Sequence, residues 1–205
     1  MKLSVVIVIW ILFGLTACAS GWPTEPAAST PTSDNHVPTE SLPQMQVYPG
    51  GEVGLAFDYP VGWYVHEAGK SLQITPNAQP TWSSFFDPDQ PHGGPSFDLL
   101  HNLNRQMGPT PLAEVAFLLE GYGDAVEVME TAVPLADSPN VVMGVYRFTQ
   151  DEEDRVLLLG AAVNPLTDTP QPVVALSGVV SMAELDEIRP IFETILLSLR
   201  VAGTS

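Results

Sequence analysis

Two nearly continuous apolar segments in the second half of the chain constrain its fold more than any other feature. Residues 156–163 include no polar side chain, and residues 173–180 include only Ser177. A strand tends to read as an unbroken apolar run when both of its faces are covered, whereas a half-exposed strand alternates. The two segments therefore predict strands of a sheet that is covered on both faces.

Shorter patterns around these segments predict further strands and two helices. Thr110 suits the N-cap of a helix that Gly121 would end. Ser181 and Glu184 form a capping box at the start of a C-terminal helix, in which Pro190 predicts a kink or a restart. The other predicted strands are 53–57, 63–66, 72–75, 96–103, 126–133 and 141–148.

The charge of the chain excludes one large class of partner. The sequence holds 24 acidic and 7 basic side chains, which gives a formal net charge of −17. Binding to nucleic acid depends on clustered lysine and arginine, so nucleic acid is not an expected partner. An anionic lipid surface would also repel such a domain. We therefore expect membrane contact to come from a lipid anchor and not from a basic patch.

The N-terminal residues have the layout of a secretory signal. Lys2 precedes the apolar run 5–13, and small residues lead to Cys18, the only cysteine. Residues 15–18, Leu-Thr-Ala-Cys, resemble the bacterial lipobox. This resemblance implies cleavage after a signal peptide of residues 1–17 and attachment of lipid to Cys18. The alternative is an ordinary signal peptide with a chance cysteine near its end.

Composition divides the rest of the chain into a tether and one domain. Residues 18–46 are rich in Pro, Ser and Thr and lack apolar periodicity, which predicts a disordered tether. The alternative is a strap packed on the domain, with Trp22 as its anchor. Residues 47–201 have the usual size of one domain, and 202–205 form a short tail.

The two ends of this domain resemble those of a known family. Residues 55–65 contain Tyr-Pro-Val-Gly-Trp after an extended run, and residues 192–201 end a helix with Ser-Leu. Both features resemble PsbP-like domains, as does the order of predicted elements between them. The resemblance implies an α+β fold, an antiparallel sheet sandwiched by helices (an α/β/α sandwich). The family has no shared catalytic motif to map onto this chain.

A long loop carries the clearest candidate metal ligands. Residues 76–95 contain five prolines and the aromatic side chains Trp82, Phe85 and Phe86. Asp87, Asp89 and His92 also lie there and include ligand types that hold Ca²⁺ or Zn²⁺. Their spacing matches no known motif, so a solvated acidic loop is the simpler interpretation, and we predict no metal and no cofactor.

Two other features permit both a structural and a functional interpretation. Residues 151–154 are four carboxylates in a row, which could attract a cation but fit a solvated hairpin tip. Trp63 follows a Pro-Val-Gly turn. It could stack on a ligand, although a tryptophan in this position more often covers the core.

No catalytic motif emerges from the sequence. Ser177 and Gly178 lie in an apolar run and lack the first glycine of a hydrolase motif. Gly93 and Gly94 precede a strand and not a helix, so they do not form a phosphate-binding loop. The histidines are scattered at His36, His66, His92 and His101.

We therefore expect a lipoprotein, anchored to the cell membrane and facing outside the cytoplasm, that is not an enzyme. Its expected role is that of a binding or assembly module for an unidentified protein partner, presented by a sheet edge or by the 76–95 loop. The alternative is a small-ligand or metal-binding lipoprotein with a pocket near this loop. Inward-facing polar groups and perturbed carboxylates would favour the alternative.

Overall fold

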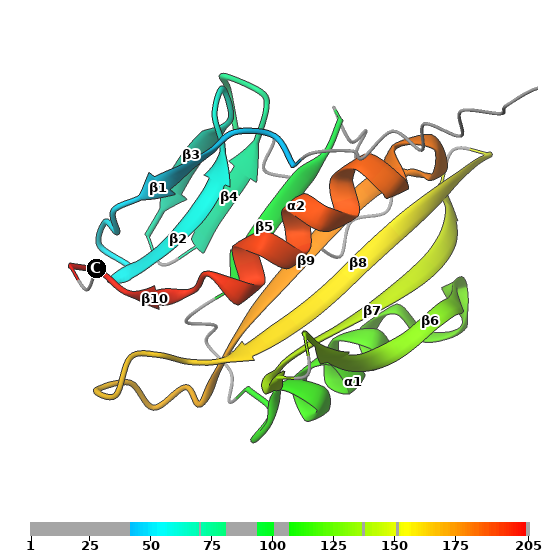
Figure 1. Ribbon diagram of the computed structural model, residues 1–205. Helices are drawn as coiled ribbons and strands as arrows, with labels where there is room; N and C mark the ends of the chain where they lie inside the picture. Colours follow the sequence, from blue (N-terminus) through cyan, green and yellow to red (C-terminus); the bar gives the residue numbers. More distant parts are fainter. Residues whose placement is uncertain are drawn as a thin grey trace, which may run out of the picture. The chain divides into compact units, whose positions relative to one another are not determined.

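The alternating and apolar segments form two antiparallel sheets in the computed structural model, which describes residues 42–69, 71–80, 94–100, 107–136, 138–150 and 152–203. All of them belong to one unit, Glu40–Ser205. The larger sheet has seven strands (Figure 1). In spatial order these are β3 (Tyr64–Ala68), β4 (Ser71–Thr75), β5 (Ser96–Leu100), β9 (Val173–Ser181), β8 (Glu153–Val163), β7 (Ser138–Gln150) and β6 (Val126–Leu135).

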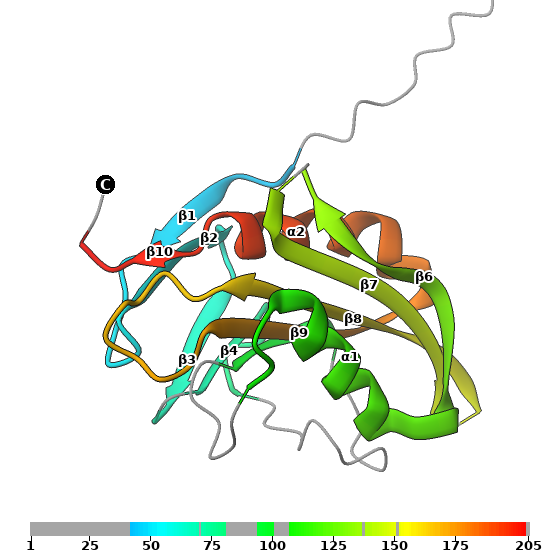
Figure 2. The ribbon, with the colours of Figure 1, turned by 90° about the horizontal axis from the view of Figure 1, so that it is seen from below.

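The two apolar segments form β8 and β9, which are neighbours inside this sheet. Successive residues of β8 contact different apolar clusters: Leu158 packs with the cluster of helix α2 (Leu185–Leu197), and Leu157 with that of α1 (Pro111–Tyr122). The strands run between the two helices (Figure 2). Coverage on both faces, as predicted, explains why these segments contain almost no polar side chain.

Helix α2 is anchored by its N-terminal cap and by its apolar stripe. The predicted capping box of Ser181 and Glu184 is present and opens a 3-10 turn, η2 (Met182–Glu184). The predicted restart at Pro190 is wrong, because α2 continues through that residue. A proline inside a helix costs about 3 kcal/mol. Burying a large apolar side chain contributes about 1.5–3 kcal/mol, and α2 buries several, including Phe192 and Ile195.

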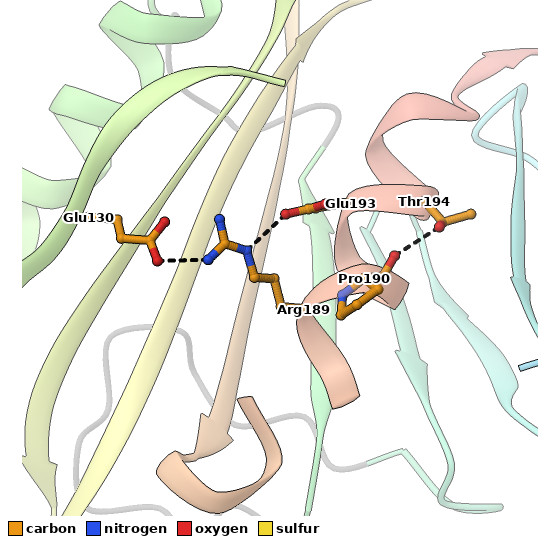
Figure 3. Close-up of polar contacts among 5 residues, drawn as sticks. All are labelled: Glu130, Arg189, Pro190, Glu193 and Thr194. Atoms are coloured by element: carbon orange, nitrogen blue, oxygen red, sulfur yellow. Dashed lines mark hydrogen bonds and ion pairs between the residues drawn. The ribbon is translucent and has the colours of Figure 1, made fainter. Parts of the chain in front are cut away.

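Polar contacts along α2 support the same arrangement (Figure 3). Thr194 Oγ1 donates a hydrogen bond of 2.8 Å to the carbonyl of Pro190. Arg189 binds Glu193 one turn away and reaches Glu130 on strand β6, with N–O distances of 2.9 and 2.7 Å. These half-exposed ion pairs connect the helix to the edge of the sheet but contribute little stability.

Helix α1 covers the other face and contacts β6, β7, β8 and β9. Thr110 caps it as predicted, since its side chain accepts a hydrogen bond from the backbone N–H of Ala113. The helix ends at Gly123 and not at Gly121, because Gly123 takes up the positive φ of 57° at the C-cap. A short 3-10 turn, η1 (Gly123–Ala125), follows. Neither helix in the described ranges has the length and apolar character needed to cross a membrane.

The smaller sheet joins the beginning and the end of the described chain. Its first strand begins two residues inside the range 18–46 that we expected to be a tether. Pro60, which we expected in a Pro-Val-Gly turn, is the last residue of its central strand. Its strands, in spatial order, are β1 (Met45–Tyr48), β2 (Leu55–Pro60) and β10 (Arg200–Val201).

Aromatic side chains fill the core between α2 and the larger sheet. Phe192 is fully buried, and its ring centroid lies 5.2 Å from that of Phe97. Trp63 is half-buried, and its ring centroid lies 5.5 Å from that of Phe97. Trp63 therefore packs against the core, as the structural interpretation predicted. Antiparallel sheets with two helices confirm the α+β class.

Candidate functional site

Several residues predicted to carry function lie outside the described residues. These include Cys18 and the possible metal ligands Asp87, Asp89 and His92. The loop 76–95 is described only at its two ends, so the predictions for its aromatic side chains also stay predictions. Among the residues that are described, no group of three or more His, Cys, Asp or Glu side chains could hold a metal ion.

The described part of the acidic run, Glu152 to Asp154, lies at the connection between the paired strands β7 and β8 and at the start of β8, as the hairpin interpretation predicted. Glu152 takes up a positive φ of 66° there. Glu153 binds Arg155 at 2.7 Å, and Asp154 accepts a hydrogen bond of 3.3 Å from Thr149. These two carboxylates are therefore engaged within the hairpin, and Asp151 lies outside the described residues.

An open depression of about 290 Å³ lies beside this hairpin. Its lining is mostly polar and includes Asp124, Glu127, Asp154 and Arg147. Arg147 forms an ion pair with Glu127 across the strands β6 and β7. The only cation of the lining is thus already paired, and the feature is a solvated groove between charged side chains.

A second polar cluster crosses the face of the larger sheet on which α1 packs. His66, Gln73, Asp98 and Ser177 are direct register partners across β3, β4, β5 and β9. We call these four residues the polar row. Their neighbours in sequence, such as Leu72 and Phe97, pack with α2 on the opposite face. Because side chains of a strand alternate between faces, all four members of the row share the α1 side.

The register brings these side chains close together. Directly opposite residues of antiparallel strands have Cβ atoms about 4.5–5.5 Å apart. Gln73 is fully buried, and its Nε2 donates a hydrogen bond of 3.3 Å to Asp98 Oδ1. His66 Nε2 lies 3.0 Å from the carbonyl oxygen of Asn77. Asp98 is partly exposed as a residue, whereas Gln73 and Ser177 are buried.

Two buried hydroxyl groups beside Asp98 have no hydrogen-bond partner among the described residues. One is the Oγ of Ser177, a residue with 1% exposure that lies directly opposite Asp98. The other is the Oγ of Ser96, two residues before Asp98 on the same face. A buried polar group without a partner costs about 1–3 kcal/mol. Such groups are rare in folded proteins, so two of them beside one carboxylate mark the place as unusual.

The electrostatic environment of Asp98 is also unusual. Burial raises the pKa of Asp98 from 3.8 to about 6, and the hydrogen bond from Gln73 offsets part of this rise. Burial, with a contribution from the charge of Asp98, raises the pKa of Tyr122 at the end of α1. Desolvation is thus the main perturbation, which is typical of carboxylates at functional sites.

No basic side chain in the described ranges neutralises Asp98. Each described arginine binds a different carboxylate. Asp98 is therefore charged near neutral pH while partly buried and without a counter-ion among these residues. The ion pairs are Arg147–Glu127, Arg155–Glu153, Arg189–Glu130, Arg189–Glu193 and Arg200–Asp58.

Local sequence patterns did not reveal this site, although they drew attention to two of its members. Ser177 was considered only as part of an incomplete hydrolase motif, and His66 only as one of four scattered histidines. The signal that was present is a polar residue inside an apolar stretch, as at Asp98 and Ser177. Only the strand order brings positions 66 and 177 into one row.

Comparisons with known proteins show a shared fold. No protein-family model matches this chain, and no curated protein matches it in sequence. It is similar to the crystal structure of the Ran-binding protein Mog1p of Saccharomyces cerevisiae, with 10% identity, coverage of 78% of this chain and 96% of that chain, and a TM-score of 0.50.

Two further structures are similar at lower TM-scores. One is the cyanobacterial PsbP of Synechocystis sp. PCC 6803, with 13% identity, 80% and 95% coverage and a TM-score of 0.46. The other is LpqN of Mycobacterium tuberculosis, involved in cell envelope biogenesis, with 15% identity, 78% and 92% coverage and a TM-score of 0.41. At these identities the comparison with Mog1p shows that this chain shares its fold, and none of the three shows a function.

Proposed function

We propose that this chain is a non-catalytic binding module that recognises a small ligand at the polar row. The observation that carries the proposal is the partly exposed Asp98 beside the unpartnered hydroxyls of Ser96 and Ser177. Strands β4 and β5, which carry part of the row, flank the 76–95 loop. The alternative function expected from the sequence was a ligand-binding pocket near this loop.

We expect the polar row to contribute little to the stability of the folded domain. A buried polar group contributes little when paired and costs free energy when unpaired. The opposite face of the same strands is apolar at Leu72, Phe97 and Leu176. A second apolar face would stabilise the domain more, so the retained polar groups support a binding role.

The arrangement does not support hydrolysis by Ser177. A nucleophilic serine needs a base within hydrogen-bond reach, which a third group orients. His66 lies on β3, three strands from β9. Neighbouring strands are about 4.8 Å apart, so the two side chains start about 14 Å from each other. Asp98 is the nearest titratable member of the row, but no orienting group with a hydrogen bond to it is described besides Gln73.

A protein-binding role is a second candidate, supported by the free edge of the larger sheet. The edge strand β6 exposes Val128, Met129 and Val133, by 51%, 42% and 54%. Exposed apolar side chains on an edge strand are typical of contacts with another chain. If this edge recruits a partner, Val128→Lys together with Val133→Lys would abolish its capture from membrane extracts, and Asp98→Asn would not.

The location that we propose is outside the cytoplasm, with the domain tethered by lipid on Cys18. The N-terminal charge, the apolar run and the lipobox-like residues 15–18 support this. The finer fold description that we propose is the PsbP-like α/β/α sandwich, supported by the packing of α1 and α2 on opposite faces. Cys18→Ser should release the protein from membranes or leave an unprocessed precursor, which membrane fractionation and mass spectrometry would measure.

A thermal-shift screen tests the ligand-binding function. The full chain, purified in mild detergent, is screened against sugars, polyols, amino acids, amines and carboxylates. A ligand at about 100 times its Kd should stabilise the folded state by about 2.7 kcal/mol. The variants Ser177→Val and Asp98→Asn should lose this stabilisation, whereas Asp168→Asn, at an exposed position, should keep it. If no ligand stabilises the chain, the proposal fails.

A further inference from the structure

We propose, on the basis of the second candidate function above, that the edge strand β6 binds a short extended segment of a partner protein in which apolar and basic side chains alternate. Among the described strands, only β7 pairs with β6, which lies at the border of the larger sheet (Figure 1). An unpaired edge presents N–H and C=O groups, to which an extended chain can add as a further strand.

The opposite edge of the larger sheet is less open than β6. Its edge strand β3 carries Glu67, whose carboxylate accepts hydrogen bonds of 2.5 Å from Tyr48 Oη and 3.3 Å from the N–H of Glu52. The end of β1 and the loop after it therefore lie against β3. On β6, by contrast, residues 127–131 are exposed in succession. Because side chains of a strand alternate between its faces, both faces of β6 are open along this stretch.

The two faces of β6 differ in chemistry. Val128 lies opposite Tyr146, which packs in the apolar cluster of α1, so Val128 belongs to the α1 face. Glu127 precedes Val128 by one residue and therefore belongs to the α2 face. Glu130 shares the α2 face, because it lies opposite Val145, which packs in the cluster of α2. An added strand that matches this pattern places basic side chains on the α2 face and apolar side chains on the α1 face.

Carboxylates outnumber arginines around β6. The open depression of about 290 Å³ beside the hairpin is lined by three carboxylates and one arginine. Farther along the strand, Arg189 binds the carboxylates of Glu130 and Glu193. Five carboxylates and two arginines thus leave a local charge of −3. Basic side chains on the added strand reduce this repulsion, and opposite charges on neighbouring strands stabilise the pairing.

The same charges disfavour a second copy of this chain as the occupant. In an antiparallel pair of β6 strands that continues the sheet, the carboxylates of both copies would share one face. Like charges directly opposite each other destabilise a sheet. The net charge of −17 adds a general repulsion between copies. A basic segment is attracted at each of these points.

Irregularities along β6 restrict the partner to a short segment. The register with β7 is regular from Val126 to Val128 and shifts after Val128, after Glu130 and after Pro134. Bulges and prolines protect an edge from long, unspecific pairing, because they interrupt its row of backbone donors and acceptors. Strand addition is therefore confined to the stretch around Glu127 and Val128.

Fluorescence anisotropy with labelled synthetic peptides tests this assignment on the full chain in mild detergent. The main probe is a short peptide in which lysine and valine alternate. A control peptide with the same residues in two blocks carries the same charge and should bind at least about fivefold more weakly. Methylation of the backbone nitrogens along one edge of the probe should weaken binding at least about tenfold, because it removes several hydrogen bonds. Glutamate in place of lysine should abolish binding.

Two substitutions with the same loss of charge locate the peptide on the chain. Glu127→Gln should weaken the alternating peptide by about fivefold or more, because it removes a carboxylate and leaves Arg147 unpaired beside the peptide. Glu153→Gln is the matched control, since Glu153 has the same exposure of 66% and also pairs with an arginine, Arg155. This control should leave the affinity unchanged. Val128→Lys should weaken the peptide as well, because it places a charge on the apolar face.

The outcomes separate the partner chemistry from the protein-binding function. Equal binding of the alternating and block peptides, or an equal loss in Glu127→Gln and Glu153→Gln, would show a general attraction to the acidic surface and overturn the assignment. A dimer in analytical ultracentrifugation that Val128→Lys dissociates would assign the edge to a second copy and also overturn it.

Failure of every peptide to bind overturns the alternating basic segment. If Val128→Lys together with Val133→Lys still abolishes partner capture from membrane extracts, the protein-binding function stands without this partner chemistry. If capture also persists in that double variant, β6 has no binding role. Ligand binding at the polar row is independent of these results, and Asp98→Asn should leave the affinity for the peptide unchanged.

Discussion

The strands β4, β5 and β9 present two different faces to the two helices. Toward α2 they place only apolar side chains, which pack around Phe192 in one continuous core. Toward the α1 side they carry Gln73, Asp98 and Ser177 in one row, next to hydroxyls without partners. Alternation along each strand thus separates an apolar face, which stabilises the fold, from a polar face, at which we propose that a ligand is recognised.

The adjacent residues Ser177 and Gly178 show this division within one strand. Ser177 points to the α1 side, where its hydroxyl has no partner. Gly178 faces α2, and a Cβ there would lie 2.5 Å from a ring carbon of Phe97. The glycine therefore lets the aromatic core approach the sheet closely. The difference between the two faces can be tested by substitutions on each of them.

The largest effect is expected on the α2 face. Phe192→Ala should lower the free energy of unfolding by about 3–5 kcal/mol, because it leaves a cavity beside Phe97 and the strands. Urea unfolding of the variant and of the wild type measures this loss. A loss below about 1 kcal/mol would mean that the α2 face does not carry the core.

The next effect concerns the charge on the α1 face. The pKa of Asp98 is raised from 3.8 to about 6. Between these two pH values the carboxyl group is protonated in the folded state and ionised in the unfolded state. Protonation of Asp98 therefore stabilises the folded state. This contribution is complete below about pH 4 and is lost as the pH rises through about 6. The loss is about 3 kcal/mol.

Comparison with Asp98→Asn isolates this contribution from other carboxylates. The stability of the wild type relative to the variant should fall by that amount between about pH 4 and about pH 7. Chemical unfolding at several pH values measures the difference. If the free energy of unfolding depended on pH in the same way in the wild type and in Asp98→Asn, Asp98 would be solvated and the polar face would be ordinary surface.

A smaller effect is expected at the rim of the α2 core. Trp63→Ala should cost about 2 kcal/mol, less than for a fully buried aromatic residue, because Trp63 is only half-buried against Phe97. Tyr64→Ala, at the neighbouring and more exposed position, serves as the control in thermal unfolding. Equal stability of the Trp63 variant and the wild type would favour the alternative interpretation, in which Trp63 stacks on a ligand.

The smallest effect compares two serines. Ser177→Ala should leave the stability unchanged or raise it by up to about 1 kcal/mol, since its hydroxyl makes no hydrogen bond. Ser198→Ala should lower it by about 1 kcal/mol, because Ser198 Oγ accepts from the N–H of Asp58 and donates to the carbonyl of Ile195. Thermal unfolding of both variants gives the comparison. A clear loss at Ser177 would show a structural role for this hydroxyl.

Features that depend on neighbouring residues were predicted well from the sequence. The cap at Thr110, the capping box at Ser181 and the apolar strands β8 and β9 all follow from local patterns. The errors were also local. Gly121 was chosen over Gly123 as the end of α1, and Pro190 was expected to interrupt a helix whose buried stripe keeps it continuous.

The sequence by itself determined which segments become strands and helices, because periodicity and capping are properties of residues a few positions apart. It also determined the strong negative charge and the N-terminal features on which the lipid anchor is predicted. Only the tertiary structure decided that β5 pairs with both β4 and β9, and so that Gln73, Asp98 and Ser177 stand in one row. The pKa of Asp98 rises because the carboxyl is buried in the folded chain, and no local pattern records this burial.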